Sequence, residues 1–359
     1  MKKRIVYIDK LKALAIFLIC FIHYTMLSPS CLDNFVDMFC FAGVSIFFMV
    51  NGALLLNKNY SKSKHIKKTV NMLIVLFFWE IISLIYFAAL YDRNFQNFSI
   101  KDIISYFFGC IRWELPTGHF WFVIALVSIY LLFLIIKPFY DMPGGKKTLL
   151  QIILLIVLLD FIPNDIDHIQ NYMMQKNSEH IAIEFSMLDA YLPFGKYGYA
   201  FVYFAWGGLV HNCFYVENRL KDSRYRKLVR RFAVFLIFVG WIYIYVMKGL
   251  ATGFYGENFT NFPNGYACCG TLLLATGVYL SFLLNENGKE IKAINIISDN
   301  TLGIYYIHCL FLAFISYRLY PLIEERGIII NFIKALIVLF LSLGTTILIK
   351  KIPLLKKLV

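Results

Sequence analysis

The chain alternates between long apolar stretches and short polar ones over almost its whole length. Ten apolar runs are long enough, or nearly so, to cross the hydrocarbon core of a bilayer, which takes about 20 helical residues. They lie at roughly residues 9–28, 35–56, 70–91, 119–137, 148–163, 196–213, 232–250, 266–285, 300–318 and 327–349. The fifth run is short and has Asp160 near its end. This pattern predicts an all-α, polytopic integral membrane bundle of about ten transmembrane helices.

The charges of the connecting segments predict how this bundle is oriented. Basic residues outnumber acidic ones in segments 57–68, 137–147 and 214–231, and in the tail from Lys350 onward. The alternate connections hold few Lys or Arg, and 164–195 is acidic. Lys and Arg accumulate in the cytoplasmic loops of membrane proteins. We therefore expect both termini in the cytoplasm, which requires an even number of helices. Among the connections expected on the cytoplasmic side, only 286–299 is not basic.

Composition agrees with a membrane protein. The chain is 60% hydrophobic and 16% charged, whereas soluble domains average about 45–50% apolar and about 25% charged. The formal net charge of +13 would suggest nucleic-acid binding in a soluble chain, but the basic residues here lie in short loops between apolar runs. We expect the lipid bilayer as the surroundings, no nucleic-acid partner, and a single transmembrane domain over residues 1–359.

Cysteine usage gives no sign of a metal centre. The eight cysteines are scattered, apart from the adjacent Cys268 and Cys269, and none form a CxxC motif. We expect neither a zinc or other metal site nor a disulfide framework. The basic start, Lys2 to Arg4, precedes an apolar run without a small-residue cleavage site, so this run is interpreted as a retained first helix.

The first apolar run carries Asp9, Lys12 and His23 among its ionisable residues. Such residues are costly inside a bilayer and are therefore functional candidates. Lys12 and His23 are eleven positions apart, which is about three helical turns, or about 16 Å, on nearly one face. Asp9 lies one turn before Lys12, where it could pair with it. Each residue also has a purely structural explanation. Lys12 could extend its ammonium group to the cytosolic membrane interface, and His23 could be a structural residue that is hydrogen-bonded inside the bundle.

This opening segment, Arg4-Ile-Val-Tyr-Ile-Asp9 through His23, resembles the start of the membrane-bound acyltransferase-3 family. The first helix of that family carries a basic residue, ten intervening residues and then a histidine. Four further segments resemble the family in the same order, namely Phe47–Gly52, Gly118–Phe122, Tyr199–Gly208 and Ser298–His308. The resemblance spans nearly the whole chain. One difference is Asn51, which stands where the family usually has Ser.

The resemblance implies an acyl-CoA-dependent O-acyltransferase. Members of the family take an acyl group, usually acetyl, from cytosolic acyl-CoA and deliver it to a sugar, glycolipid or cell-wall component at the outer face. The implied partners are acetyl-CoA as donor and a glycan or lipid-linked sugar as acceptor, in the plasma membrane of a bacterium. Imidazole suits proton transfer near neutral pH. His23, assisted by Lys12 and Asp9, would either deprotonate the acceptor hydroxyl or carry the acyl group covalently.

Three lysines before the third helix, Lys64, Lys67 and Lys68, resemble a basic pair of the family. The resemblance implies that they bind the phosphates of the CoA donor. The alternative is a loop made basic by topology alone. The family often has Arg here, and Lys keeps the charge without the bidentate geometry of a guanidinium.

The remaining site candidates are assigned to substrate binding. His119 and Trp121 open the fourth helix on the outer side, near the level expected for His23. They could orient the acceptor, or only form an interfacial aromatic cluster. We assign Asn51 and His308 to substrate binding as well. The alternative for either residue is a structural hydrogen bond across helices.

A second class of function also fits ten helices with an intramembrane histidine. The alternative is an exporter or transporter of a surface polysaccharide or its precursor. Such proteins are usually built from inverted repeats with broken helices near the midplane, and no convincing pair occurs in this sequence. The Lys12–His23 pair, the basic 57–68 segment and the ordered segment matches favour the enzyme.

Overall fold

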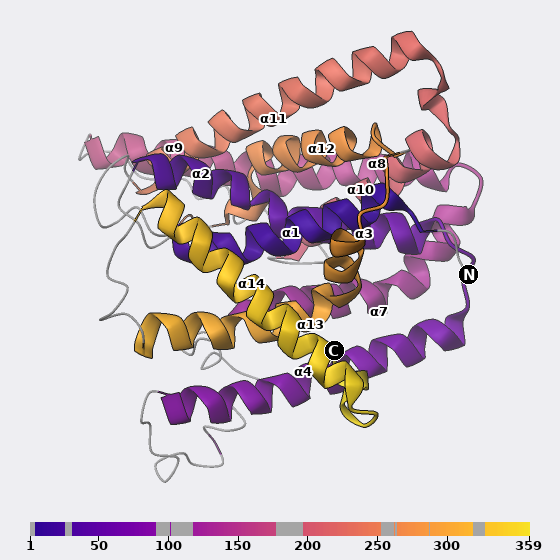
Figure 1. Cartoon of the computed structure of the whole chain (residues 1–359). Helices are drawn as coiled ribbons and strands as arrows, with labels where there is room; N and C mark the ends of the chain where they lie inside the picture. Colours follow the sequence, from indigo (N-terminus) through magenta and orange to yellow (C-terminus); the bar gives the residue numbers. More distant parts are fainter. Residues whose placement is uncertain are drawn as a thin grey trace.

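The computed structural model describes residues 4–25, 31–90, 101, 118–176, 197–252, 262, 264–286, 288–318 and 327–359, and over these residues it is helical without strands. The main helices are α1 (Val6–Thr25), α2 (Cys31–Cys40), α3 (Ala42–Leu56), α4 (Lys62–Leu90), α7 (Trp121–Asp141), α8 (Gly145–Ile156), α9 (Ile162–Lys176), α10 (Gly198–His211), α11 (Ser223–Thr252), α12 (Cys269–Leu283), α13 (Lys292–Arg318) and α14 (Ile328–Lys351). Most of them run side by side, while α14 crosses the others obliquely (Figure 1).

Each of the ten apolar runs corresponds to helix in the structure. Within the described residues, seven helical segments are long and apolar enough to cross a membrane by length and composition. The others are α1, which has three charges in its first two turns, and the shorter α10 and α12, with 14 and 15 residues. The prediction of an all-α polytopic bundle is confirmed.

The fifth run differs from the prediction in length. Its helix α8 continues through a π-helical turn, η3 (Val157–Phe161), into α9, which ends at Lys176. Residues 164–176 are therefore helical, although the sequence pattern assigned them to an outer connection. The polar first turns of α9 explain this difference, because they lack the hydrophobicity by which a span is recognised. The rest of that connection, and the connection at 92–117 apart from Lys101, lie outside the described residues.

The two ends of the described chain meet at the start of α13. The Arg4 guanidinium pairs with the Asp299 carboxylate at 2.8 Å, and Lys350 Nζ, near the end of α14, donates to Asn300 Oδ1 at 2.7 Å. The start of α1 and the end of α14 thus lie at one end of the bundle, as an even number of crossings requires. We call this the inner end and the opposite one the outer end; that it faces the cytoplasm remains a prediction.

Helix α3 lies in the core of the bundle. Twelve of its fifteen residues are buried, as expected for a helix that is hydrophobic on every side. It packs closely on α10 because both helices have glycine at the crossing. A Cβ on Gly52 would lie 1.7 Å from the Phe204 carbonyl oxygen, and one on Gly207 would lie 2.2 Å from that of Met49. Small residues at such crossings let helix backbones touch, which is a main source of attraction between helices in lipid.

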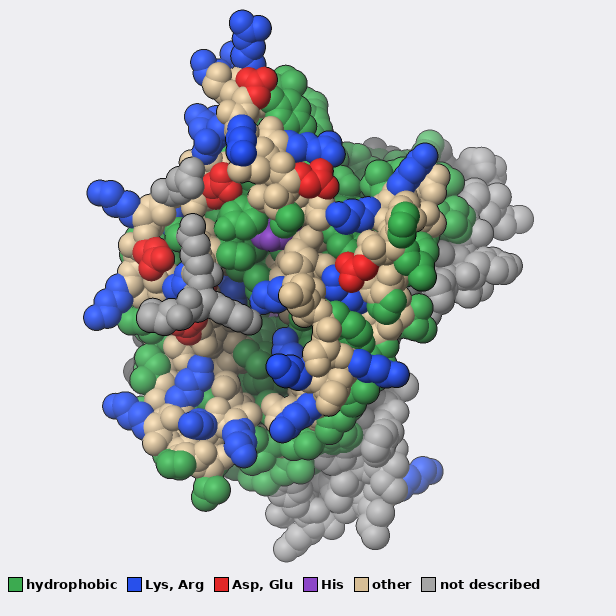
Figure 2. Space-filling view, turned by 90° about the vertical axis from the view of Figure 1, so that its right-hand side faces the viewer, with side chains coloured by type: hydrophobic (Ala, Val, Ile, Leu, Met, Phe, Trp, Pro, Cys, Tyr) green, Lys and Arg blue, Asp and Glu red, His purple; other side chains and the backbone are tan. Residues whose placement is uncertain are grey.

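The helices at the periphery present apolar side chains outward. On α4, α11 and α14 the exposed positions include Ile74, Ile81, Ile85, Phe235, Phe238, Ile242, Ile333, Ile337 and Phe340. In water, each square ångström of such surface would cost about 25 cal/mol, whereas lipid tails solvate it well. The inner end is different, because Lys and Arg side chains gather there around a hollow (Figure 2).

Candidate functional site

Three histidines from separate elements line one cavity at the outer end of the bundle. His23 comes from the last turn of α1, His119 from the short helix η2 (Gly118–Phe120) that precedes α7, and His308 from α13. The cavity has a volume of about 310 Å³, and its walls are largely aromatic, with Phe41, Trp121, Tyr266 and Tyr305 among them. The sequence-predicted residues His23, His119, Trp121 and His308 therefore lie together.

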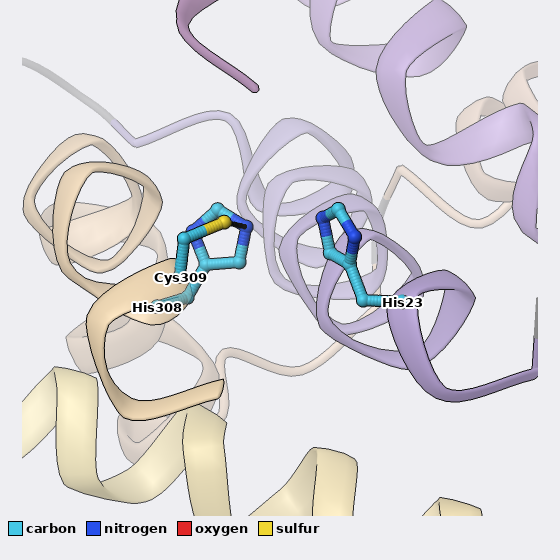
Figure 3. A group of neighbouring side chains, drawn as sticks. All are labelled: His23, His308 and Cys309. Carbon is cyan, nitrogen blue, oxygen red and sulfur yellow. Dashed lines mark hydrogen bonds between the residues drawn. The ribbon is translucent and has the colours of Figure 1, made fainter. Parts of the chain in front are cut away.

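His308 is the middle histidine of the group. Its ring centroid lies 5.4 Å from that of His23 and 5.3 Å from that of His119. Figure 3 shows the imidazoles of His23 and His308 facing each other from α1 and α13. At these separations the rings are in direct contact, so the three imidazoles form one cluster at the cavity wall.

The orientation of the His308 ring is set within its own helix. Its Nδ1 lies 2.6 Å from the Tyr305 carbonyl oxygen. A carbonyl only accepts hydrogen bonds, so Nδ1 must carry a proton. In the neutral ring Nε2 is then the basic nitrogen, and Cys309 Sγ lies 3.4 Å from it. His308 is fully buried, which keeps this arrangement away from solvent.

The start of α7 is attached to α13 next to the cavity. The Tyr305 hydroxyl donates a hydrogen bond to the His119 carbonyl oxygen, and the Tyr305 ring lies 5.8 Å from the His119 ring. Trp121 packs against Tyr266, with ring centroids 5.2 Å apart. These contacts hold His119 and Trp121 at the level of His23, where the sequence placed them.

Asp9 and Lys12 do not form the predicted direct ion pair, although the Asp9 charge acts on Lys12; each residue makes its short contacts elsewhere. Asp9 forms its ion pair with Arg4 at 3.1 Å and accepts a hydrogen bond from the Ser298 hydroxyl at 2.5 Å. Lys12 Nζ donates to the Ser298 carbonyl oxygen at 2.5 Å. Both residues thus fasten α1 to the start of α13. Arg4 could not be placed from the sequence, since its second partner, Asp299, is 295 positions away.

The same ion pairs act on Arg4, which precedes α1. Its hydrogen bonds to Asp299 and, second, to Asp9 raise the pKa of its guanidinium further above the ordinary value. The guanidinium therefore stays charged at every pH of interest, and the inner end of α1 keeps its positive charge.

Asn51 lies away from the histidine cavity, contrary to its grouping with His119 and His308. Its Oδ1 accepts a hydrogen bond from the Tyr130 hydroxyl at 3.0 Å, and that hydroxyl in turn accepts one from Lys68 Nζ at 3.1 Å. Tyr130 is nine positions beyond Trp121 on α7, or about 14 Å along the helix. Asn51 is thus connected to Lys68, one of the three predicted phosphate-binding lysines. The other two, Lys64 and Lys67, are exposed at the start of α4.

A pocket at the inner end was not recognised in the sequence. It has a volume of about 1060 Å³ and is lined by polar residues that include Asn57, Lys58, Lys137, Lys146 and Asn212. Lys137 is only 5% exposed, and its Nζ donates to the Leu56 carbonyl oxygen at 2.9 Å and to Asp141 at 2.6 Å. Its lysines lie in the basic segments 57–68 and 137–147, whose charge the positive-inside rule already accounts for, so the sequence offered no separate sign of a pocket.

His211, next to this pocket, has a partner that only the fold could show. It is the last residue of α10 and is buried. Its Nδ1 makes a hydrogen bond with the Tyr7 hydroxyl of α1. This bond fixes α10 against α1 at the inner end.

Comparison with known proteins identifies one relationship. A family model described as an acyltransferase domain matches residues 5–351, which is nearly the whole chain. No curated protein and no solved structure matches the chain.

Proposed function

The chain belongs to the acyltransferase-3 family and is a multi-pass membrane acyltransferase, and on that premise we propose its donor, acceptor and chemistry. The donor is cytosolic acyl-CoA carrying an acetyl group. The acceptor is a hydroxyl of an extracytoplasmic sugar, glycolipid or cell-wall polysaccharide. The membrane is the plasma membrane of a bacterium.

The observation that carries this proposal is the position of His23. It lies in a cavity with two more histidines at the outer end, while Lys12 of the same helix lies eleven positions nearer the inner end. CoA is elongated, with phosphates at one end and the thioester at the other. A helix with a cation near its inner end and an imidazole far along it suits a donor that enters from the cytoplasm.

In the proposed reaction His23 removes the proton from the acceptor hydroxyl. The oxygen attacks the carbonyl carbon of the thioester, the C–S bond breaks, and the CoA thiolate leaves and takes up a proton. In the alternative route His23 attacks the thioester itself and holds the acyl group until the acceptor removes it. His119, His308 and Trp121 face the same cavity and are assigned to binding the acceptor.

The donor phosphates are assigned to the inner end. Lys64, Lys67 and Lys68 supply cations at the start of α4, and Lys12 and Asp9 lie in the first turns of α1, bound to Ser298 of α13. Asn51 is reassigned to this side, because Tyr130 connects it to Lys68. Phosphate binding by several lysines uses charge rather than fixed donor geometry.

Calorimetry with acetyl-CoA tests the donor half of the proposal. The protein purified in detergent should bind acetyl-CoA saturably, and Lys12→Ala should weaken that binding, while His23→Ala should change it much less. If acetyl-CoA and longer acyl-CoAs all fail to bind, the export of a polysaccharide or its precursor becomes the better explanation.

The acceptor half needs the membrane. Membranes that contain the protein are given acetyl-CoA labelled in the acetyl group, and the envelope glycan and lipid fractions are then separated. We expect label in one of them, removed by mild alkali as an ester would be, and absent with His23→Ala. If the label is found only in acetyl-CoA and free acetate, with the wild-type protein as with His23→Ala, acyl transfer to an envelope acceptor would be contradicted.

A further inference from the structure

The geometry points to a zinc-binding site formed by His23, His308 and Cys309 at the outer end of the bundle. Their potential ligand atoms, one from each side chain, all lie within 4.8 Å of one another. The group joins α1 to α13 (Figure 3), and two of its members, His23 and His308, line the histidine cavity. This inference goes beyond the proposed transfer reaction and does not depend on it.

The distances are close to those a metal would need. Zn–N bonds of about 2.0–2.1 Å and Zn–S bonds of about 2.3 Å put tetrahedral ligand atoms about 3.3–3.6 Å apart. Cys309 Sγ and His308 Nε2 already lie 3.4 Å apart. The remaining separations must shorten by at most about 1.5 Å, which a rotation of the His23 side chain at the end of its helix can supply.

His308 is oriented as metal-binding histidines usually are. Such residues donate their second ring N–H to a carbonyl or carboxylate, which fixes the tautomer and leaves the other nitrogen as ligand. Here Nδ1 donates to the Tyr305 carbonyl oxygen at 2.6 Å, and Nε2 faces Cys309 Sγ. The supporting contact of a metal ligand is thus in place beside the thiol.

The set of ligands selects the kind of metal. Two imidazoles and one thiolate are borderline to soft ligands, which favour Zn²⁺ over Mg²⁺ or Ca²⁺. Binding converts the Cys309 thiol to a thiolate and releases its proton to solvent. Three protein ligands leave a fourth position of the tetrahedron, and the adjacent cavity supplies space for it.

The expectation of no metal site was based on cysteine spacing along the chain. Sequence spacing cannot reveal this group, because His23 and His308 are brought together only by the packing of α1 on α13. On the proposed function the site has one consequence for activity. A metal takes the lone pair that His23 would use as base or nucleophile, so bound Zn²⁺ should inhibit transfer.

Cobalt spectroscopy tests the site directly in the purified full-length protein without a polyhistidine tag. Co²⁺ takes the same tetrahedral geometry and is coloured. One equivalent should give visible d–d bands and a near-ultraviolet thiolate-to-cobalt band, and Zn²⁺ should displace it. In Cys309→Ser the thiolate band should disappear, and in His308→Ala the Zn²⁺ Kd should rise at least about 100-fold, since loss of even an outer contact typically costs 10–100-fold.

Cys40→Ser is the matched control. Cys40 lines the same cavity, but its thiol donates to the Val36 carbonyl oxygen at 3.6 Å, so the variant should keep both the band and the affinity. No tetrahedral spectrum in the wild-type protein would overturn the proposal, as would a thiolate band that persists in Cys309→Ser. The spectrum needs no acyl donor, so this result is independent of whether acyl transfer is found.

Discussion

At the scale of single residues, Tyr305 makes two contacts that position the histidine cavity. The Tyr305 oxygen holds the Nδ1 proton of His308, and the Tyr305 hydroxyl holds the start of α7 through the His119 carbonyl. Tyr305 thus positions two of the three histidines. His23, the third, lies in the last turn of α1 with its ring 5.4 Å from that of His308.

His23→Ala should reduce acyl transfer by about 10²–10⁴-fold, the usual contribution of a general base, and by more if His23 carries the acyl group. Label transfer from acetyl-CoA measures it, with the yield of folded protein compared by gel filtration. Cys20→Ala, one turn earlier on α1 and buried, is the control and should retain most activity. Equal activity in wild type and His23→Ala would remove His23 from the mechanism.

At the scale of elements, the contact of α3 with α10 has no space for a side chain at Gly52 or Gly207. The two helices approach so closely that backbone atoms occupy the space of a Cβ at Gly52 and Gly207. The backbones must separate if either glycine gains a side chain, and Phe48 and Phe204 are buried beside them. The core of the bundle therefore depends on these two residues.

Gly52→Ala should destabilise the protein by more than the about 1–3 kcal/mol that overpacking a core usually costs. The midpoint of thermal unfolding in detergent measures this loss. Gly344→Ala is the control, because a Cβ there meets nothing within 4 Å. That change should be neutral or raise stability by up to about 1 kcal/mol through helix propensity. Similar midpoints for both variants would show that α3 and α10 separate without cost.

The first turns of α4 are the element assigned to the donor phosphates. Lys64→Gln and Lys67→Gln together should raise the KM for acetyl-CoA more than the KM for the acceptor, because the two side chains are exposed cations. Lys68→Gln should raise it further and also loosen Tyr130, its hydrogen-bond partner. Steady-state kinetics at two salt concentrations check this. A donor KM that does not change would leave these lysines with a role in topology alone.

At the scale of the whole molecule, both ends of the described chain lie at the inner end, held by Arg4, Asp299 and Lys350. The histidine cavity lies at the outer end. The bundle thus separates a basic end from an aromatic end, and the proposed reaction needs both.

The orientation can be tested with two cysteines. Cys31 is exposed at the start of α2, at the outer end, and Cys213 is partly buried just after α10, at the inner end. A membrane-impermeant maleimide applied to intact cells should label Cys31, and it should reach Cys213 only after the membrane is opened. Peptide mapping by mass spectrometry distinguishes the two sites. The opposite order of labelling would reverse the predicted topology.

The sequence predicted the fold well because length and hydropathy determine helices in a bilayer. Each of the ten apolar runs contains a helix. The polar α9 was not predicted, and α4, α11 and α13 begin earlier than predicted, at Lys62, Ser223 and Lys292, inside segments that the sequence assigned to connections. Side-chain partners were harder to predict, since they depend on which helices touch. Asp9 was assigned to Lys12 on its own helix but pairs with Arg4, and Asn51 was grouped with His119 but contacts Tyr130. His308 and Cys309 could not be related to His23 without the packing of α1 on α13.

One continuous helix carries both Lys12 and His23, so the separation between them is fixed. A loop could stretch or fold to accommodate donors of different length, but α1 cannot. On the proposed function, α1 therefore sets the length of the donor that can reach both residues. A thioester whose arm is shorter than that of CoA can engage the lysine or the histidine, but not both at once. Truncated donors would then be poor substrates even when their acyl group is correct.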